Sequence, residues 1–153
     1  MNEDSPKTVS SRMPGHLIRR LHQVSTHIFH QRVRAAGFDI TPVQFAALDA
    51  LRHKPGIDQA GLADAIAKDR ATVGDVADRL VQKGLVSRTV SRHDKRAREL
   101  TITDKGEATI TALLPVVEQL QKEILPGLDD AEFSQFVALA AKATRAIRSG
   151  GER

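Results

Sequence analysis

Residues 58–103 combine two short amphipathic helices with a following pair of strands, and this order restricts the fold more than any other feature of the chain. Asp58 is suited to cap a first helix that ends near Lys68–Asp69, and Gly84 is suited to end a second. The second helix repeats apolar residues with a helical period: Val73, Val76, Ala77, Leu80 and Val81. Leu85–Ser91 and Glu99–Thr103 alternate as strands do. Helix, turn, helix and hairpin in this order predict a winged helix-turn-helix.

The loop between the two strands is strongly basic. Residues 92–98 carry four cations and one anion, with no apolar anchor. A cationic hairpin tip is suited to contact phosphates and the minor groove of DNA, because neutralising the backbone supplies most non-specific affinity. The alternative is a solvated hairpin whose charges only protect a sheet edge from aggregation. The helix pair before the loop favours the first interpretation.

Further helices are expected on both sides of this region. Residues 14–36 and 104–148 have the apolar periodicity of helices, and Pro115 should bend or split the second segment. Residues 41–44 form a capping box with proline at the first helical position. Residues 1–13 are polar, and we expect a disordered tail there. The expected fold is mainly α with a small β-hairpin: a winged helix-turn-helix at 37–103 with flanking dimerisation helices.

The apolar stripes of the flanking helices need a partner surface. The central unit is too small to cover all of them, so we expect a second copy to do so in an isologous homodimer. Such a dimer would place two recognition helices roughly 34 Å apart, one turn of DNA. The alternative is that these helices cover one another within a monomer.

Composition excludes several other classes. The 153 residues contain no cysteine, so disulfides, thiolate zinc sites and cysteine redox sensing are excluded. No apolar stretch is long enough for a membrane span, and residues 1–13 lack the apolar region of a signal peptide. The bacterial cytoplasm is the expected compartment. There is no phosphate loop, nucleophile elbow or metal motif, so we expect neither an enzyme nor a cofactor. The net charge of +4 permits nucleic acid as a partner.

Several short segments together resemble the MarR family of bacterial transcriptional regulators. They are Leu62–Ile66, Asp69–Val73, Asp78–Leu80, Lys83–Val86, Asp94–Arg96 and Leu100–Thr103 before Gly106. The resemblance extends from about Gly15 to about Arg148. It implies a homodimer that binds a pseudo-palindromic operator, usually as a repressor, and is released by a small ligand.

The residues expected to contact DNA lie in the second helix and the basic loop. Arg96 is the first choice for insertion into the minor groove, held by a charge-assisted bond from Asp94, and the family resemblance supports both positions. The other expected contacts to bases or phosphates are Arg70, Thr72, Gly74, Asp75, Arg79, Arg92, Lys95 and Arg98. Asp75 has two interpretations, acceptance from a cytosine amino group or a role as a surface residue or arginine partner.

A polar line on the first helix is the second candidate site. Its histidines and arginines are compatible with a solvated or dimer-contacting face, with a small-molecule site, or with a metal site at His27 and His30. The segments Gly15–Arg20 and Ile40–Phe45 resemble the branch of the MarR family that controls breakdown of aromatic and N-heteroaromatic acids. That resemblance implies an effector crevice beside the dimerisation helices, for a hydroxylated nicotinate or benzoate. Its expected walls are His16, Arg19, Arg20, Gln23, Phe45, Leu48, His53 and Leu113, and a cation such as Arg20 would pair with the carboxylate.

Three alternatives to this sensor function remain. One is a DNA-binding regulator without a small-molecule effector, including a constitutive architectural protein. Another is a metal-responsive regulator that uses the histidines of the first helix. The last is a helical module whose basic hairpin binds an acidic protein.

Overall fold

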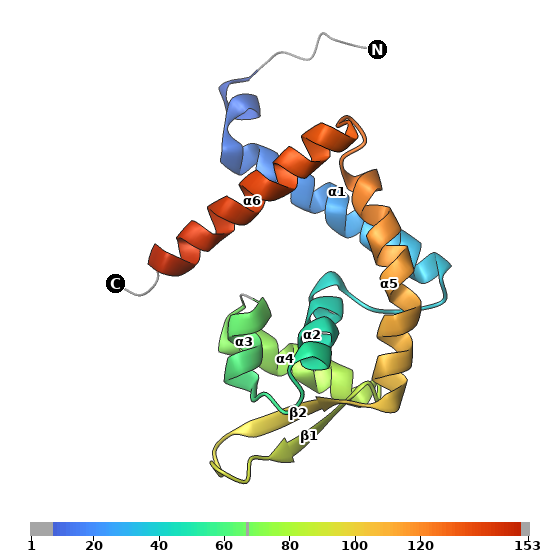
Figure 1. The fold of residues 1–153 in the computed structure, drawn as a ribbon, viewed down its shortest axis with the longest axis vertical. Coiled ribbons are helices and arrows are strands. Elements are labelled where there is room, and N and C mark those ends of the chain that lie inside the picture. Colours follow the sequence, from blue (N-terminus) through green and yellow to red (C-terminus); the bar gives the residue numbers. More distant parts are fainter. Residues whose placement is uncertain (1–7, 67, 151–153) are drawn as a thin grey trace.

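The computed structural model describes residues 8–66 and 68–150, which form seven helices and one hairpin (Figure 1). In chain order these elements are η1 (Val9–Arg12), α1 (Pro14–Ala35), α2 (Pro42–His53), α3 (Gln59–Ile66), α4 (Arg70–Gln82), β1 (Val86–Val90), β2 (Arg98–Ile102), α5 (Asp104–Ile124) and α6 (Asp130–Gly150). The expected mainly α fold with a small β-hairpin is confirmed.

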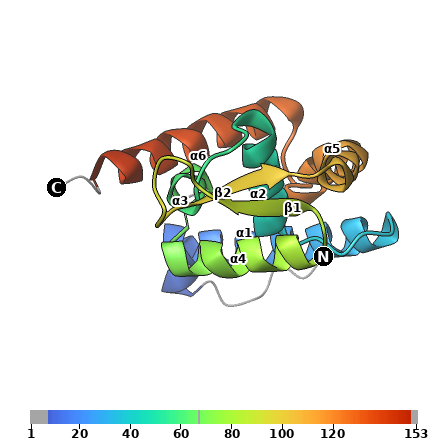
Figure 2. The same cartoon turned by 90° about the horizontal axis from the view of Figure 1, so that it is seen from below.

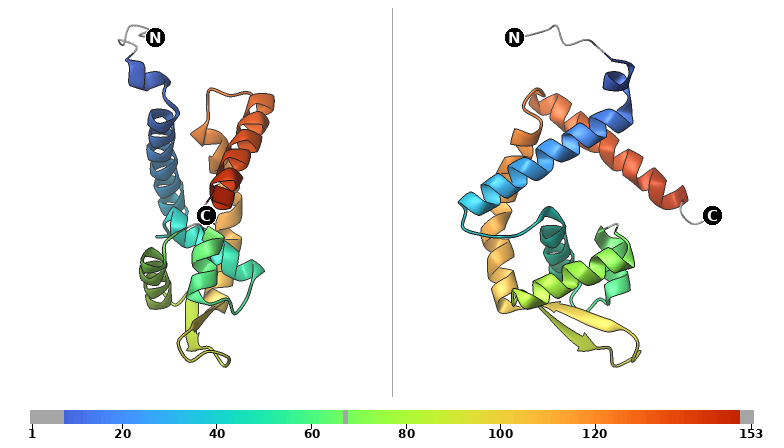
Figure 3. Two further views of the ribbon diagram at one scale, coloured as in Figure 1. Left: turned by 90° about the vertical axis from the view of Figure 1, so that its left-hand side faces the viewer. Right: turned by 180° about the vertical axis from the view of Figure 1, so that it is seen from behind.

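The molecule has two levels that α5 joins. One level holds α1, α6 and the end of α5; the other holds α2, α3, α4 and the hairpin, which protrudes at the far end (Figures 1 and 3). α5 packs along α1, and its beginning lies against β2. α2 contacts both α3 and α5, so it lies where the two levels meet.

The core is aliphatic, as the low aromatic content requires. The largest completely buried side chains come from α2, α3, α4, β2 and α5: Leu48, Leu51, Leu62, Leu80, Leu100, Ile110, Leu113 and Leu120, with Val33 of α1 and Val73 of α4. The main aromatic contribution is an edge-on contact between Phe29 and Phe45, whose ring centroids are 6.2 Å apart. This contact joins α1 to α2.

The helix ends follow the local hydrogen bonds that the sequence predicts. The Thr41 hydroxyl accepts from the Gln44 backbone N–H at 3.1 Å, and the Gln44 side-chain oxygen accepts from the Thr41 backbone N–H at 3.2 Å. Gly84 has a φ of +74°, which ends α4 in the left-handed conformation that glycine adopts readily. Both predictions are confirmed.

Two segments differ from expectation in detail. α5 continues without a break through Pro115, so the helix is not split there. Residues 9–12 form one turn of 3-10 helix where a disordered tail was expected, and the Ser11 hydroxyl donates to the Thr8 carbonyl at 2.6 Å. Residues 1–7 of that expected tail lie outside the described residues. None of the described helices is long and apolar enough to cross a membrane.

Candidate nucleic-acid interface

A side-chain cap fixes the start of α4. The Asp69 carboxylate accepts from the Thr72 backbone N–H and from the Thr72 hydroxyl, both at 2.8 Å. These two bonds hold the pKa of Asp69 below its ordinary value of 3.8, so the cap is ionised at neutral pH. The Thr72 hydroxyl proton is therefore already engaged, although this residue was expected to contact DNA.

The outer face of α4 is polar and accessible. Val73, Ala77 and Leu80 are buried against the core, which leaves the opposite side to solvent. Of the residues expected to contact DNA, Arg70, Asp75 and Arg79 are exposed, and Thr72 and Gly74 are half-buried. The whole set therefore has access to a ligand that approaches α4 from outside, with Thr72 and Gly74 at its margins.

The hairpin is an antiparallel pair with a folded tip. Val86 pairs with Ile102 and Val90 with Arg98. The tip closes because the Ser91 backbone N–H donates to the Ala97 carbonyl at 3.1 Å and the Ala97 N–H donates to the Asp94 carbonyl at 3.0 Å. We call residues 91–97 the wing tip.

The expected bond between Asp94 and Arg96 exists in a different form. The Asp94 carboxylate accepts from the backbone N–H of Arg96 at 2.9 Å, and no bond to the guanidinium is formed. This is an Asx turn, in which a short aspartate side chain accepts a hydrogen bond from the backbone N–H two residues later. Asp94 therefore shapes the wing tip and leaves the Arg96 side chain available, which corrects the expected mode of support.

Unpaired cations concentrate at the wing tip and on α4. Within the described part of the chain, the side chains of Arg70, Arg79, Arg92, Lys95 and Arg96 have no hydrogen-bond or ion-pair partner, and all five are exposed. Arg98 donates from Nη1 to the Lys95 carbonyl at 3.4 Å and remains exposed. Free surface cations are what a protein needs to neutralise phosphates without first breaking its own ion pairs.

An ion pair connects the wing to the recognition helix. The Arg88 guanidinium of β1 contacts the Asp78 carboxylate of α4. Asp78 is not among the expected DNA contacts, and this pairing gives its carboxylate a structural role. Figure 2 shows the hairpin beside α4, so the two elements lie together at one end of the molecule.

A cleft of about 350 Å³ separates the wing from the starts of α3 and α4. It is lined by Asp58, Gln59, Ala60, Arg70, Asp94, Arg96, Ala97 and Arg98. Four of these were expected to contact DNA. Ala97 of the wing tip was not predicted, and neither were Asp58, Gln59 and Ala60 from α3 and its cap. They reach the cleft because Asp58 bridges to Glu99 of β2. An isolated bridge between residues so far apart in the chain cannot be predicted from sequence periodicity.

The residues expected to bind an effector are only partly brought together. Leu48 and Leu113 are completely buried in the core, so neither offers surface to a crevice in the single chain. His16 and Arg19 are neighbours, with Nδ1 and Nη2 3.4 Å apart. His53 is exposed at the end of α2, where its Nδ1 lies 2.8 Å from the Asp49 carbonyl.

Arg20 and Phe45 are not adjacent either. Phe45 contacts Phe29, and nine residues of helix, roughly 13 Å of rise, separate Phe29 from Arg20. Arg20 and Gln23 are both exposed on α1. A second cleft, of about 190 Å³, lies between α1 and α5, and its residues are Arg32, Val116, Gln119, Leu120 and Glu123. None of these was expected to bind an effector, and the described residues contain no group of three acidic or histidine side chains that would hold a metal.

Comparison with known proteins identifies the family of this chain. A sequence profile of the MarR family matches residues 38–97. The transcriptional regulator HosA of Escherichia coli O157:H7 is 32% identical over 127 residues, which cover 83% of this chain and 91% of HosA. The chain belongs to the MarR family of transcriptional regulators. The expected non-enzymatic function is confirmed, because the family and its curated relatives are regulators.

Two further MarR relatives are known for more specific properties. The transcriptional repressor NicR of Pseudomonas putida is 31% identical over 140 residues, 92% of this chain and 87% of NicR. The solved structure of BpsR from Bordetella bronchiseptica superposes with a TM-score of 0.81 and 31% identity, covering 92% of this chain and 98% of BpsR. DNA binding by BpsR is regulated by 6-hydroxynicotinic acid.

Proposed function

We propose that the chain is a dimeric repressor that binds a pseudo-palindromic operator, with α4 in the major groove and the wing tip in the adjacent minor groove. The observation that carries this proposal is the set of unpaired, exposed cations on α4 and the wing tip, because these two elements lie side by side at one end of the molecule. A winged helix-turn-helix docks in this way when its helix and wing reach neighbouring grooves. The relative NicR is a repressor, which supports repression as the proposed mode of regulation. The bacterial cytoplasm is the compartment we expect, because the operator is there.

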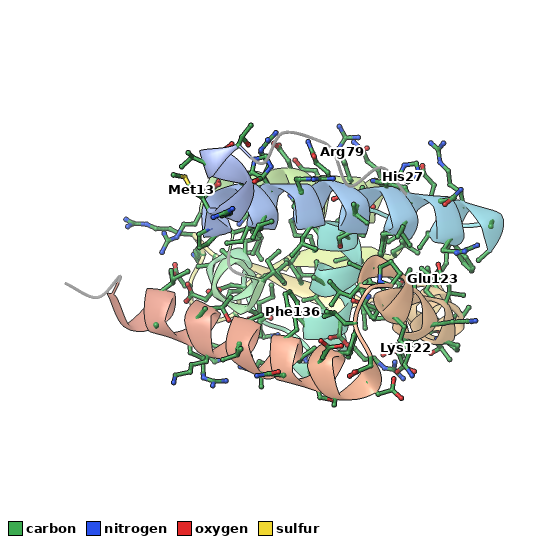
Figure 4. All side chains as sticks on the ribbon, turned by 90° about the horizontal axis from the view of Figure 1, so that it is seen from above. Met13, His27, Arg79, Lys122, Glu123 and Phe136 are labelled. Carbon is green, nitrogen blue, oxygen red and sulfur yellow. The ribbon has the colours of Figure 1, made fainter. Side chains whose placement is uncertain are left out.

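The dimer is proposed from apolar surface that the single chain leaves open. On α6, Phe136 is 37% exposed, Val137 50%, Leu139 58% and Ile147 74%. Figure 4 shows Phe136 directed from α6 toward α1, whereas His27 and Arg79 lie at the opposite side of the molecule. α1 adds exposed Leu17, Ile18 and Val24. Apolar stripes of this extent on two long helices are typical of a subunit interface, so we assign residues 14–36 and 104–148 to dimerisation and 37–103 to DNA binding.

We further propose that a hydroxylated aromatic acid, a nicotinate or benzoate, releases the operator. Exposed Arg19 and Arg20 supply cations for a carboxylate, and half-buried Phe45 supplies an aromatic surface at the junction of the two levels. Because Arg20 and Phe45 are not adjacent in the single chain, we propose that the partner copy supplies part of the site. The regulation of BpsR by 6-hydroxynicotinic acid supports this class of ligand.

Release would operate as a population shift. The free dimer holds its recognition helices at a spacing that suits DNA, and the effector binds more tightly to a different spacing. Only this difference in affinity between the two states drives dissociation.

One binding experiment tests the main proposal. Fluorescence anisotropy with fragments of the upstream region should show a saturable complex at physiological salt that random DNA does not displace. Addition of 6-hydroxynicotinic acid or a hydroxybenzoate should raise the apparent Kd. Arg20→Ala should remove the response to the acid, whereas Arg34→Ala, an exposed cation on the same helix, should keep it. No selective complex with any fragment would contradict the regulator itself.

The dimer has an independent test. The mass of one chain is 16.7 kDa. Sedimentation equilibrium at micromolar concentration should give twice this mass. A mass of one chain would reject the dimer.

The alternative without an effector has one observation in its favour. Neither cleft described above contains a residue of the expected effector site. Selective DNA binding that no aromatic acid changes would support this alternative over the sensor.

A further inference from the structure

Most aspartates near the proposed DNA-binding surface have a structural role within the protein. They act as caps, turn formers or ion-pair partners. Asp58 accepts from the Gly61 N–H at 2.7 Å, Asp69 caps α4 through Thr72, Asp78 pairs with Arg88, and Asp94 accepts from the Arg96 N–H. Each of these four negative charges is therefore explained by the fold.

Asp75 differs from these four. Among the described residues its carboxylate has no hydrogen-bond or ion-pair partner, and it is exposed. The nearest helical partner would be Arg79, four residues on, yet no bond joins them. The interpretation of Asp75 as an arginine partner therefore has no support in the structure.

The position of Asp75 on α4 is central to the exposed face. At 100° per residue it lies roughly 170° from the mean direction of the buried Val73, Ala77 and Leu80. Gln82 lies about as far round, but at the C-terminal end of α4. A recognition helix contacts base edges with its N-terminal residues, and in that half of α4 Asp75 is the side chain directed most nearly away from the core.

An unpaired carboxylate at that place opposes binding to DNA in general. DNA is a polyanion, and each negative charge near its phosphates weakens non-specific affinity. A carboxylate has only acceptor sites, so in the major groove it bonds to amino groups that present no competing acceptor, and the cytosine N4 amino group is the base donor that aspartate suits best.

We propose that Asp75 is a specificity-determining residue that accepts a hydrogen bond from the N4 amino group of a cytosine in each operator half-site. This inference rests on the proposed docking of α4 in the major groove. It assigns the residue a selective role, because the carboxylate penalises every sequence that lacks the cytosine.

The test compares the wild type with Asp75→Asn by selection from random duplex DNA. Asparagine pairs with the N6 and N7 atoms of adenine, so one position in each half-site should change from cytosine to adenine. Replacing the cytosine should weaken wild-type binding roughly 5- to 150-fold per base pair. Affinity for random DNA should rise in the variant, because a negative charge has been removed.

Two controls isolate the role of Asp75. Glu118→Gln removes the same charge from an exposed position of α5, and it should leave base preference unchanged. Asp75→Ala should lose the cytosine preference without gaining one for adenine. Equal urea midpoints for all variants establish that each is folded.

The outcomes separate this inference from the proposed function. If the wild type enriches a site and Asp75→Asn enriches the same site, the role of Asp75 is wrong and the regulator stands. A variant that loses affinity without any change of preferred base also overturns the proposal, since Asp75 then acts through a neighbour such as Arg79. If the wild type enriches no sequence, the proposed function and the inference both fail.

Discussion

Two glycines inside helices have different surroundings, and alanine at each should change stability in opposite directions. A Cβ at Gly106 of α5 would lie 2.2 Å from the Leu85 carbonyl oxygen. That oxygen accepts from the Thr103 N–H at 3.0 Å, so it cannot retreat without loosening the bond between the hairpin and α5. A Cβ at Gly74 of α4 would have its nearest neighbour, the Gln59 Nε2 atom, at 3.9 Å, which is ordinary contact.

These contacts set the expected magnitudes. Alanine stabilises a helix interior by about 0.8–1 kcal/mol relative to glycine, so Gly74→Ala should raise the free energy of unfolding by that amount. Gly106→Ala has the same gain but also overpacks the site, at about 1–3 kcal/mol, and weakens a hydrogen bond worth about 0.5–1.5 kcal/mol. The net expectation is a loss of about 0.5–3.7 kcal/mol. For a chain of this size, that lowers Tm by roughly 1–15 °C.

Urea unfolding followed by circular dichroism, at one fixed protomer concentration, measures both variants. Gly74→Ala serves as the matched control, because it makes the same chemical change in another helix. A Gly106→Ala protein as stable as the wild type would refute the reasoning, since it would mean that α5 does not approach Leu85 so closely in solution.

Three further outcomes are expected. Arg96→Ala should reduce the slope of log Kd against log salt by about 1.8, because a dimer loses two cations from the minor groove and each cation near the backbone releases about 0.9 counterion. Arg34→Ala on α1 should leave the slope unchanged in the same titration, and equal slopes for both variants would count against the wing contact. Asp69→Ala should lower the thermal midpoint most above pH 5. The folded state depresses this pKa, so the stabilisation is present above the ordinary value of 3.8 and is lost as the pH falls through the lower folded value; a difference that persists in acid would contradict this. Phe136→Asp should convert the dimer to monomers in sedimentation, while an unchanged mass would exclude the α6 stripe from the interface.

Sequence patterns located the helix ends well because the bonds that set them are local. Thr41 and Gln44 exchange hydrogen bonds at 3.1 and 3.2 Å, as the spacing of a capping box predicts. Gly84 adopts positive φ at the position where α4 must end. In both cases the partners lie within a few residues, so no knowledge of the fold was needed.

Features that depend on distant contacts were harder to predict. Leu48 and Leu113 were expected to line the effector crevice, but both are completely buried. Helical periodicity shows that a residue faces inward and does not show how deeply it is buried. The Asp94 carboxylate had two partners within reach in Arg96, and only the folded turn shows that the backbone N–H receives it. The place of Gln59 in the wing cleft follows from a bridge between residues 41 positions apart, Asp58 and Glu99.

The end of the recognition helix is bonded to the parts of the molecule from which release would start. The Lys83 ammonium donates to the Asp39 carbonyl and to the Gln44 side chain, at the connection between α1 and α2. Lys105 of α5 donates in turn to the Lys83 carbonyl at 3.0 Å. Hydrogen bonds to charged groups contribute about 1.5–3 kcal/mol each, and coupling between two ligand sites is typically about 1–3 kcal/mol. A single one of these bonds, kept in one state of the proposed dimer and lost in the other, would therefore be sufficient for the proposed effector to control α4, without any rearrangement of the aliphatic core.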